Sequence, residues 1–350
     1  MKIILEKIKY QLKAQLPFVV YNKSKELKVS ALFQKDSFLH VLTNNFERKG
    51  FIFAPFHNDL KTVLIPVEES VKIESSFVQH PIELEDTISI NSTSKSNHEK
   101  LVAKGVLAIK NNLFKKVVLS RKEELIIDDI EVIEIFQKLL LTYPNAFVYM
   151  WFHPKVGLWL GATPETLLNI ENNRFSTMAL AGTQVFDKNN EPSWSKKEID
   201  EQQFVTDYIE KKLTDFSKRI KLSEPKTVKA GTLLHLCTNI SGELDETKQN
   251  GLFSLINLLH PTPAVCGLPK EAARKFILSS ENYDRSYYTG YLGELNMHNK
   301  NVQLFVNLRC MEIVNDKIII YVGGGVTAES CPEKEWEETV SKSKIMLKVL

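Results

Sequence analysis

The chain has 350 residues, of which 43% are hydrophobic and 25% are charged, a composition that allows one large or two ordinary globular domains. Its 45 basic and 43 acidic side chains nearly balance at a net charge of +2, which argues against nucleic acid or an anionic membrane surface as a partner. The cysteines lack CxxC spacing, so neither a zinc site nor a disulfide framework is expected at Cys237, Cys266, Cys310 and Cys331.

The N-terminal residues 1–24 carry a charge every few positions, which is not typical of a signal peptide. No apolar run reaches the ~18 residues of a membrane span, so a cytoplasmic location is expected. Short strand-like runs follow, at 18–21, 38–42, 50–56 and 62–67. The polar segment 86–100 is then expected to be a loop or boundary.

The rest of the chain shows clearer patterns. Helical spacing of apolar residues predicts helices over 97–112, 128–144, 195–216, 251–261, 269–279 and 332–350. Strands are predicted over 115–120, 146–154, 157–163, 174–183, 228–244, 287–295, 302–314 and 317–326. Many strands among few long helices favour an α+β fold with antiparallel sheets over a doubly wound parallel sheet.

Two of the predicted helices carry paired acidic residues. Glu198 and Glu201 are three apart, as are Glu335 and Glu338, so each pair shares a helix face. One carboxylate from each helix, together with a substrate, would suffice for Mg²⁺, which prefers oxygen ligands and keeps some waters. Solvated surface acids explain the same spacing, and Glu338 with Lys342 has the i,i+4 spacing of a surface ion pair.

Lys116 enters an apolar strand on the same face as Val118 and Ser120. If the lysine is buried there, its pKa falls and it becomes a usable base. The alternative is a lysine at a strand end whose ammonium reaches solvent.

Glu165 follows Pro164 and precedes apolar residues. A carboxyl in an apolar pocket has a raised pKa and can act as a general acid. An ordinary helix start, with proline at its first position and glutamate beside it, is the alternative.

Two further features carry weaker signals. Gly323, Gly324 and Gly325 follow a strand, so their backbone N–H groups can approach an anion, although a tight turn explains them equally well. Arg309 lies inside a predicted hydrophobic strand and needs a partner, either a ligand carboxylate or a structural ion pair.

The segments that contain these residues, taken in their order along the chain, resemble the chorismate-utilising enzymes. The resemblance runs from about Asn97 to the C-terminus. The matching blocks are KVVLSR, GATPETLL, LAGT, KEIDEQQFV, LLHLCTNISGEL, LHPTPAVCGLP, YYTGYLGEL, VNLRC and GGGVTAESCPEKEWEETVSKSKIML. The resemblance implies an α+β fold in which large antiparallel sheets surround a central core, with helices outside and the site in a cleft. Residues 1–95 would be a divergent N-terminal part of that fold, and 96–350 the chorismate-binding catalytic core.

The resemblance also implies residue roles in Mg²⁺-dependent chemistry on chorismate. Lys116 would activate water for attack at ring carbon C2, and Glu165 would protonate the departing C4 hydroxyl. Glu201 and Glu335 would be Mg²⁺ ligands, with Glu198 and Glu338 supporting. The implied substrate-binding residues are Thr183, His235, Ala264, Tyr288, Arg309, Gly323, Gly324, Gly325 and Lys342.

Within the family, the sequence is most similar to isochorismate synthases, which are isomerases. Relatives that attack the ring with a lysine carry it where this chain has Ala181, and the HPTPAVCG stretch differs from that of ammonia users, so no glutaminase subunit is expected. Ala264 and Gly267 would keep the pocket wall thin enough for a flat ring and one water. Two departures from the family pattern, Gln202 and Thr289, remove no catalytic group.

Menaquinone biosynthesis is the favoured pathway, with a siderophore-pathway isochorismate or salicylate synthase as one alternative and a catalytically silent chorismate-binding relative as another. A monomer or weak dimer is expected.

Overall fold

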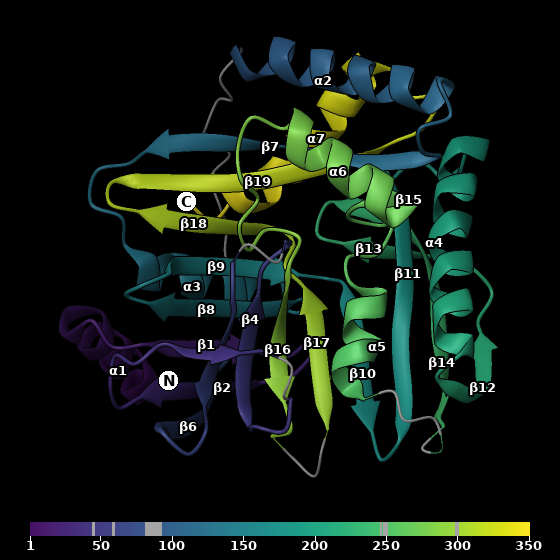
Figure 1. Cartoon of the computed structure of the whole chain (residues 1–350). Helices are drawn as coiled ribbons and strands as arrows, with labels where there is room; N and C mark the ends of the chain where they lie inside the picture. The colour runs from purple at the N-terminus through teal and green to yellow at the C-terminus, as the bar shows by residue number, and fades with distance from the viewer. Residues whose placement is uncertain (44–45, 58–59, 81–92, 246, 248–250, 298–300) are drawn as a thin grey trace.

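The structure is a computed structural model that describes residues 1–43, 46–57, 60–80, 93–245, 247, 251–297 and 301–350 (Figure 1). Over these residues the chain forms two antiparallel sheets. The first runs in the order β15 (Gly267–Leu268), β7 (Lys116–Ile126), β19 (Lys317–Val326), β18 (Cys310–Val314), β9 (Gly157–Thr163), β8 (Phe147–His153), β1 (Phe18–Asn22), β2 (Lys28–Gln34) and β6 (Ser70–Ser76).

The second sheet lies across the first in Figure 1. Its order is β12 (Ser217–Leu222), β14 (Leu233–Leu244), β11 (Arg174–Val185), β10 (Thr166–Glu171), β17 (Val302–Val306), β16 (Tyr291–Leu295), β4 (Gly50–Ala54), β5 (Thr62–Pro66) and β3 (His40–Leu42). Strand β13 (Lys226–Ala230) pairs with β14. The predicted α+β class with antiparallel sheets is confirmed.

An aromatic core fills the space between the two sheets. Phe53 of the second sheet lies among Trp151, Trp159 and Tyr287, and its ring centroid is 4.4 Å from that of Tyr287. Because β8 is buried along its whole length, its sequence is a continuous apolar run rather than an alternating one.

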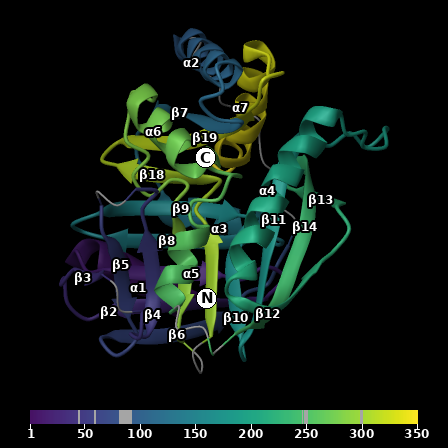
Figure 2. The ribbon, with the colours of Figure 1, turned by 45° about the vertical axis from the view of Figure 1, so that its right-hand side comes forward.

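Helices cover the outer faces. Helices α1 (Lys2–Ala14), α3 (Val132–Thr142) and α7 (Pro332–Leu347) share a core with the first sheet. Helices α4 (Lys196–Thr214) and α5 (Leu252–Leu259) pack on the second, as Figure 2 shows for α4. Helices α2 (Thr93–Lys110) and α6 (Lys270–Ser280) pack over β7. No helix among the described residues is long and apolar enough to cross a membrane.

Two predicted strands are broken in the structure, and both breaks have a backbone cause. Residues 302–314 divide into β17 and β18, which belong to different sheets, and Arg309 lies in the turn between them with a φ of 48°. Residues 228–244 turn back at Gly231, whose φ is 65°, to form the β13–β14 hairpin. Arg309 is therefore not inside a strand, which corrects the prediction.

Other boundaries also differ from the predictions. Helix α2 begins at Thr93, so the expected loop over 86–100 is wrong for 93–100, while 86–92 lie outside the described residues. The predicted strand 287–295 begins only at Tyr291, because 286–289 form a turn. Helix α1 was not predicted; it buries Ile4 and Ile8, which are four apart on one face.

Candidate functional site

A small cavity of about 70 Å³ lies where two chain crossings between the sheets meet. Pro164 and Glu165 connect β9 to β10, and residues 307–309 connect β17 to β18. The crossings are tied together: the Thr163 hydroxyl donates to the Val306 carbonyl at 2.6 Å, and the Ala162 N–H donates to the Arg309 carbonyl at 2.9 Å. The helix start that was the alternative for Glu165 is therefore wrong, since the residue links two strands.

Most of the predicted site residues meet at this cavity. Its lining includes Glu165, Thr183, Glu201, His235, Ala264, Tyr288, Arg309, Gly323, Gly324, Gly325 and Lys342. Glu198, Glu335 and Glu338 line an adjoining acidic cavity instead. The sequence did not single out several apolar or aromatic lining residues: Leu180, Val265, Leu308, Tyr321 and Val322.

Lys116 lies behind the cavity wall and is completely buried. Its Nζ is 3.0 Å from Oε1 of Glu201, an ion-pair distance, and makes no hydrogen bond within the described part of the chain. Val118, two residues on along β7, lines the cavity, as strand alternation predicts for the same face. A lysine whose ammonium reaches solvent is therefore excluded.

Glu165 is 3% exposed, and burial raises its pKa to about 8 against the opposing charges of Lys116, Arg309 and Lys342. A carboxyl with that pKa carries its proton at neutral pH. It can therefore donate a proton to a departing group.

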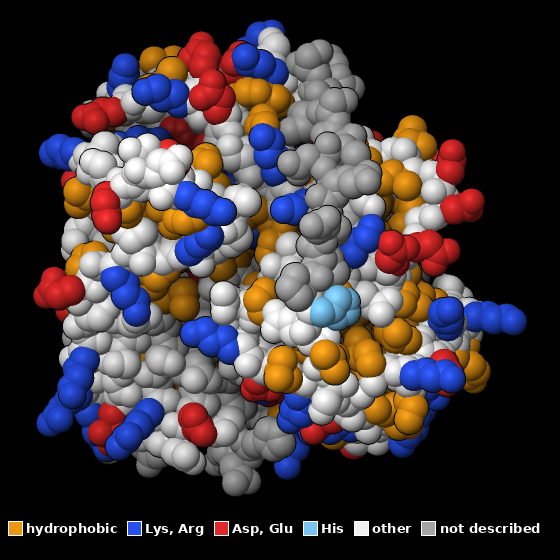
Figure 3. Space-filling view, turned by 180° about the vertical axis from the view of Figure 1, so that it is seen from behind, with side chains coloured by type: hydrophobic (Ala, Val, Ile, Leu, Met, Phe, Trp, Pro, Cys, Tyr) orange, Lys and Arg blue, Asp and Glu red, His pale blue; other side chains and the backbone are white. Residues whose placement is uncertain are grey.

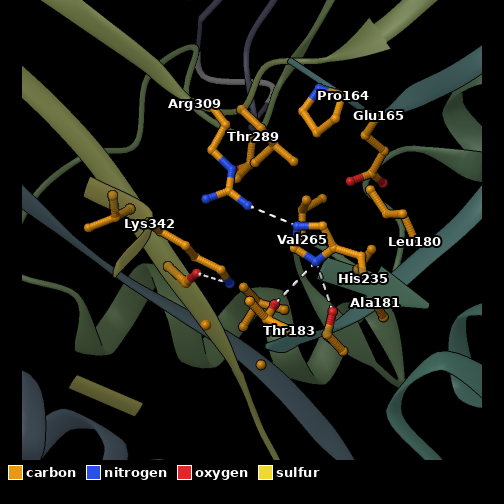
Figure 4. A pocket seen from close by; sticks show the side chains of 18 of the residues that line it. Pro164, Glu165, Leu180, Ala181, Thr183, His235, Val265, Thr289, Arg309 and Lys342 are labelled. Carbon is orange, nitrogen blue, oxygen red and sulfur yellow. Dashed lines mark hydrogen bonds between the residues drawn. The ribbon is translucent and has the colours of Figure 1, made fainter. Parts of the chain in front are cut away.

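His235 and Arg309 are joined at the cavity (Figure 4). Because a guanidinium only donates, the contact of 3.3 Å from Arg309 Nη2 makes His235 Nε2 an acceptor. His235 Nδ1 then carries the proton and donates to the Gly182 carbonyl at 2.8 Å. Burial lowers the pKa of His235 to about 3, so the ring is neutral.

Arg309 is 9% exposed and makes no ion pair with a carboxylate of the described residues, while its Nη1 is buried without a hydrogen-bond partner there. The structural ion pair that was one alternative is thus not found within the described chain. A planar donor with a free nitrogen suits a ligand carboxylate.

The three consecutive glycines of β19 lie against the charged groups. A Cβ on Gly325 would lie 2.1 Å from Glu201 Oε1 and 3.2 Å from Lys116 Cε. A Cβ on Gly324 would lie 3.4 Å from oxygens of both Glu335 and Glu338. The glycines are needed here because they lack side chains, and the tight-turn alternative is wrong, since all three pair with β7.

We expect Gly325→Ala to separate Glu201 from Lys116 and to lower kcat at least tenfold, since the carboxylate must move to admit the methyl group. Gly251→Ala is the matched control, because a Cβ there meets nothing within 4 Å. Steady-state kinetics and a crystal structure of each variant would check this. Full activity of Gly325→Ala would show that the Lys116–Glu201 contact is dispensable.

Three acidic residues of the site each have their own lysine. Glu201 pairs with Lys116, Glu335 with Lys197, and Glu338 with Lys342 at 2.5 Å. Lys342 also donates to the Gly323 carbonyl at 2.8 Å.

Lys197 was missed, although it lies four residues before Glu201 on α4 and therefore on the same helix face. Of the three pairs, the spacing in the sequence indicated only the one between Glu338 and Lys342.

The donor set fits a hard divalent cation. Glu335 is 1% exposed, its Oε2 is buried with no hydrogen-bond partner among the described residues, and burial together with Glu338 raises its pKa to about 7. Carboxylate oxygens on α4 and α7 are ligands that Mg²⁺ prefers. Glu198 differs, because its carboxylate accepts from the Ser195 N–H at 2.9 Å and caps α4.

The carboxylates at α4 and α7 do not close into a cage. In the described ranges, three ligand atoms lie within 4.8 Å of one another only at Asp36, His40 and Glu69. Arg48 contacts His40 Nδ1 at 3.3 Å and Glu69 Oε1 at 3.2 Å, so that distant group already has its cation.

The HPTPAVCG stretch supports Lys116 from the edge of the first sheet. Strand β15 pairs with β7, so that Leu268 faces Lys116, and a Cβ on Gly267 would lie 2.3 Å from the Lys116 carbonyl oxygen. The buried Arg285 donates to the carbonyls of Val118 at 2.7 Å and Val265 at 3.0 Å. Both residues line the cavity, so this arginine fixes two of its walls.

The departures from the family pattern lie beside the site. The Gln202 amide donates to the hydroxyls of Thr206 at 2.8 Å and Thr238 at 2.7 Å, which ties α4 to β14. Thr289 is fully buried, lines the cavity and donates to the Tyr288 carbonyl at 2.6 Å.

Comparison with known proteins connects this site to one family. A family model described as "Chorismate binding enzyme" matches residues 51–350. Isochorismate synthase EntC of Escherichia coli (strain K12) is 30% identical over 265 residues, which cover 73% of this chain and 67% of that protein. Isochorismate synthase DhbC of Bacillus subtilis (strain 168) is 31% identical over 268 residues, which cover 71% and 66%.

A solved structure shows the same fold. The putative 2,3-dihydroxybenzoate-specific isochorismate synthase DhbC of Bacillus anthracis superposes with a TM-score of 0.82 at 23% identity, over 99% of both chains. The whole described architecture, including the strands before the predicted catalytic core, therefore has a counterpart in a solved fold.

Proposed function

Because this chain belongs to the family of chorismate-binding enzymes, we propose that it is an isochorismate synthase, which converts chorismate to isochorismate. The observation that carries the proposal is that one cavity is lined by Glu165, a buried carboxyl whose pKa is raised to about 8, and by Arg309, which has an unpartnered guanidinium nitrogen, while the buried Lys116 lies behind its wall. The reaction needs an acid, a base and a carboxylate-binding group in that arrangement.

Substrate orientation falls to the residues that bind carboxylates. Arg309 presents an unpartnered guanidinium nitrogen, and Tyr288 is a neutral phenol, because burial raises its pKa. The neutral His235 holds Arg309 without neutralising it. We assign these groups to one carboxylate of chorismate, whose ring then lies between Glu165 and the glycines of β19.

The proton steps balance. A C2–O bond forms as water attacks, its proton passes to Lys116 Nζ, the ring double bonds shift, and the C4–O bond breaks as Glu165 donates its proton to the leaving hydroxyl. The net change moves a hydroxyl from C4 to C2. Lys116 Nζ can take this proton only as a neutral amine, so it must first lose its own proton and its ion pair with Glu201. After the reaction, proton exchange with solvent returns Lys116 to the amine and Glu165 to the acid.

We propose that Mg²⁺ is required and that Glu201 and Glu335 hold it, with Glu338 and Glu198 supporting. When bound, the ion would neutralise and fix a substrate carboxylate beside the acidic side chains. The support is the chemistry of the donor set and the unpartnered Oε2 of Glu335.

We expect Glu335→Gln to weaken Mg²⁺ binding at least tenfold, since a neutral amide is a poorer ligand than a carboxylate. Glu333→Gln is the control, because Glu333 is an exposed acid on the same turn of α7 that does not line the acidic cavity. Calorimetric titration of the substrate-free protein with Mg²⁺ measures both. Equal affinities would remove Glu335 from the metal site.

Water is the proposed nucleophile, because no amine lies where the lysine-using relatives carry theirs. Ala181 lines the cavity at that position, next to Gly182 and Thr183. Lys116 lies on another strand, behind the wall. The proposal includes no glutaminase partner, since water needs no ammonia source.

Menaquinone biosynthesis remains the proposed pathway and the cytoplasm the proposed location.

Incubation of the purified protein with chorismate and Mg²⁺, followed by chromatography, tests the activity. Isochorismate supports the proposal. Salicylate with pyruvate, or anthranilate when ammonia is added, would assign the chain to a relative's reaction. No turnover would favour the catalytically silent relative.

A further inference from the structure

The site cavity is flanked by two other cavities of opposite charge. One shares Pro164 and Arg309 with it, and the other shares Thr183. Each therefore borders the reaction site from a different side.

The first flanking cavity is basic. It lies between the end of α3 and the β13–β14 turn, and its charged lining residues are Lys229 and Arg309. Two buried polar atoms among its lining residues, Thr142 Oγ1 and Arg309 Nη1, have no hydrogen-bond partner among the described residues. A cavity with spare donors and without an acidic lining residue is suited to an anion.

The second flanking cavity is acidic. Five glutamates and two lysines line it, and the lining includes Glu338 and the buried Glu335. Glu329 and Glu337 are exposed members of the same lining. A dianion is repelled from this side, whereas a divalent cation is attracted to it.

The cavity volumes also indicate that the substrate occupies the basic cavity. The site cavity alone, at about 70 Å³, is small for a ring that carries two carboxylates, and the basic cavity adds about 250 Å³ beside it. Together they reach the lower end of the range of about 300 to 1,000 Å³ that is typical of small-molecule sites. Arg309 lies at the boundary and contacts both spaces.

We propose that the basic cavity is the route and first binding place of the dicarboxylate substrate, with Lys229 steering it toward Arg309, while the cation reaches the glutamates through the acidic cavity. This rests on the proposed function, because it takes chorismate as the dianion. Lys229 is an exposed member of this lining, and its ammonium lies 3.5 Å from the centre of the Phe186 ring, a contact that orients its charge.

The test is Lys229→Glu, with Lys226→Glu as its matched control. Lys226 is exposed on the same strand, but it does not line the basic cavity, so the net charge changes equally. We expect Lys229→Glu to lower kcat/KM for chorismate about fivefold at low ionic strength, with kcat changed less than twofold. The difference should vanish at about 1 M salt, where screening is strong. Lys226→Glu should match the wild type.

Other outcomes would overturn the route. If Lys229→Glu and Lys226→Glu give the same kcat/KM and salt dependence, the basic cavity does not carry the substrate. If Glu329→Gln/Glu337→Gln instead raises kcat/KM for chorismate, the substrate passes the acidic side.

On the proposed route that double variant should only weaken Mg²⁺ binding, as measured by calorimetry without substrate. These comparisons require a wild type that consumes chorismate, so absent turnover counts against the proposed function and not against the route alone.

Discussion

Replacing Glu165 by glutamine should lower kcat about 10²- to 10⁴-fold, because the amide keeps the shape of the side chain but has no proton to give the leaving hydroxyl. Substrate binding should change little, since the positive charges that line the cavity belong to Arg309 and Lys342. For the wild type, kcat should fall as pH rises above about 8, where Glu165 loses its proton.

The same substitution should stabilise the protein, and the effect should grow with pH. Burial raises the pKa of Glu165 from 4.5 to about 8, so between these values the unfolded chain releases a proton that the folded chain retains. The free energy of unfolding of the wild type therefore decreases as pH rises through this window, by about 1.4 kcal/mol per pH unit from this one group. Glutamine lacks this dependence, and the variant should gain about 3 kcal/mol at pH 7.

Urea unfolding at pH 5 and pH 8 would measure the difference, with Glu171→Gln as control. Glu171 is an exposed carboxylate at the far end of β10, the strand that follows Glu165. A Glu165→Gln enzyme with wild-type kcat would show that another group protonates the leaving hydroxyl. Parallel stability curves for variant and wild type would show that Glu165 ionises normally in the fold.

Lys116→Met should reduce kcat at least 10³-fold, because it removes the proposed base. The other lysine of β7, Lys122, is exposed and cannot replace it. The substitution of Lys116 should also destabilise the fold by about 3 kcal/mol, because Glu201 would keep a largely buried charge without its partner. Lys122→Met is the control: Lys122 lies on the same strand but is exposed.

A double variant separates the catalytic loss from the structural one. Lys116→Met/Glu201→Gln removes both charges, so most of the stability should return while the activity stays absent. Chemical unfolding and product chromatography on the single and double variants give both readouts. Recovery of activity together with stability would mean that Lys116 has only a structural role.

Local sequence patterns predicted the features that depend on a single strand or turn. The alternation in β7 placed Lys116 and Val118 on one face, and the apolar context of Glu165 predicted its raised pKa. Both follow from rules that need only neighbouring residues.

Features that depend on tertiary packing were not predicted. The break at Arg309 separates strands that belong to different sheets, and a left-handed backbone at an arginine leaves no sequence signal. The pair between Lys197 of α4 and Glu335 of α7 joins residues 138 positions apart in the sequence, so spacing within one helix could not reveal it. Basic and acidic side chains are mixed on the face of the molecule that Figure 3 shows. The separate basic and acidic cavities beside the site arise only when the fold brings distant residues together.

In the proposed mechanism, water attacks C2 of chorismate in the cavity that Glu165 lines, with the buried Lys116 behind its wall. The most direct test is to incubate the protein with chorismate and Mg²⁺ in water enriched in ¹⁸O and to analyse the product by mass spectrometry. This mechanism predicts isochorismate with a single ¹⁸O atom in its C2 hydroxyl. Unlabelled isochorismate, which would mean that the original hydroxyl migrates, would contradict it.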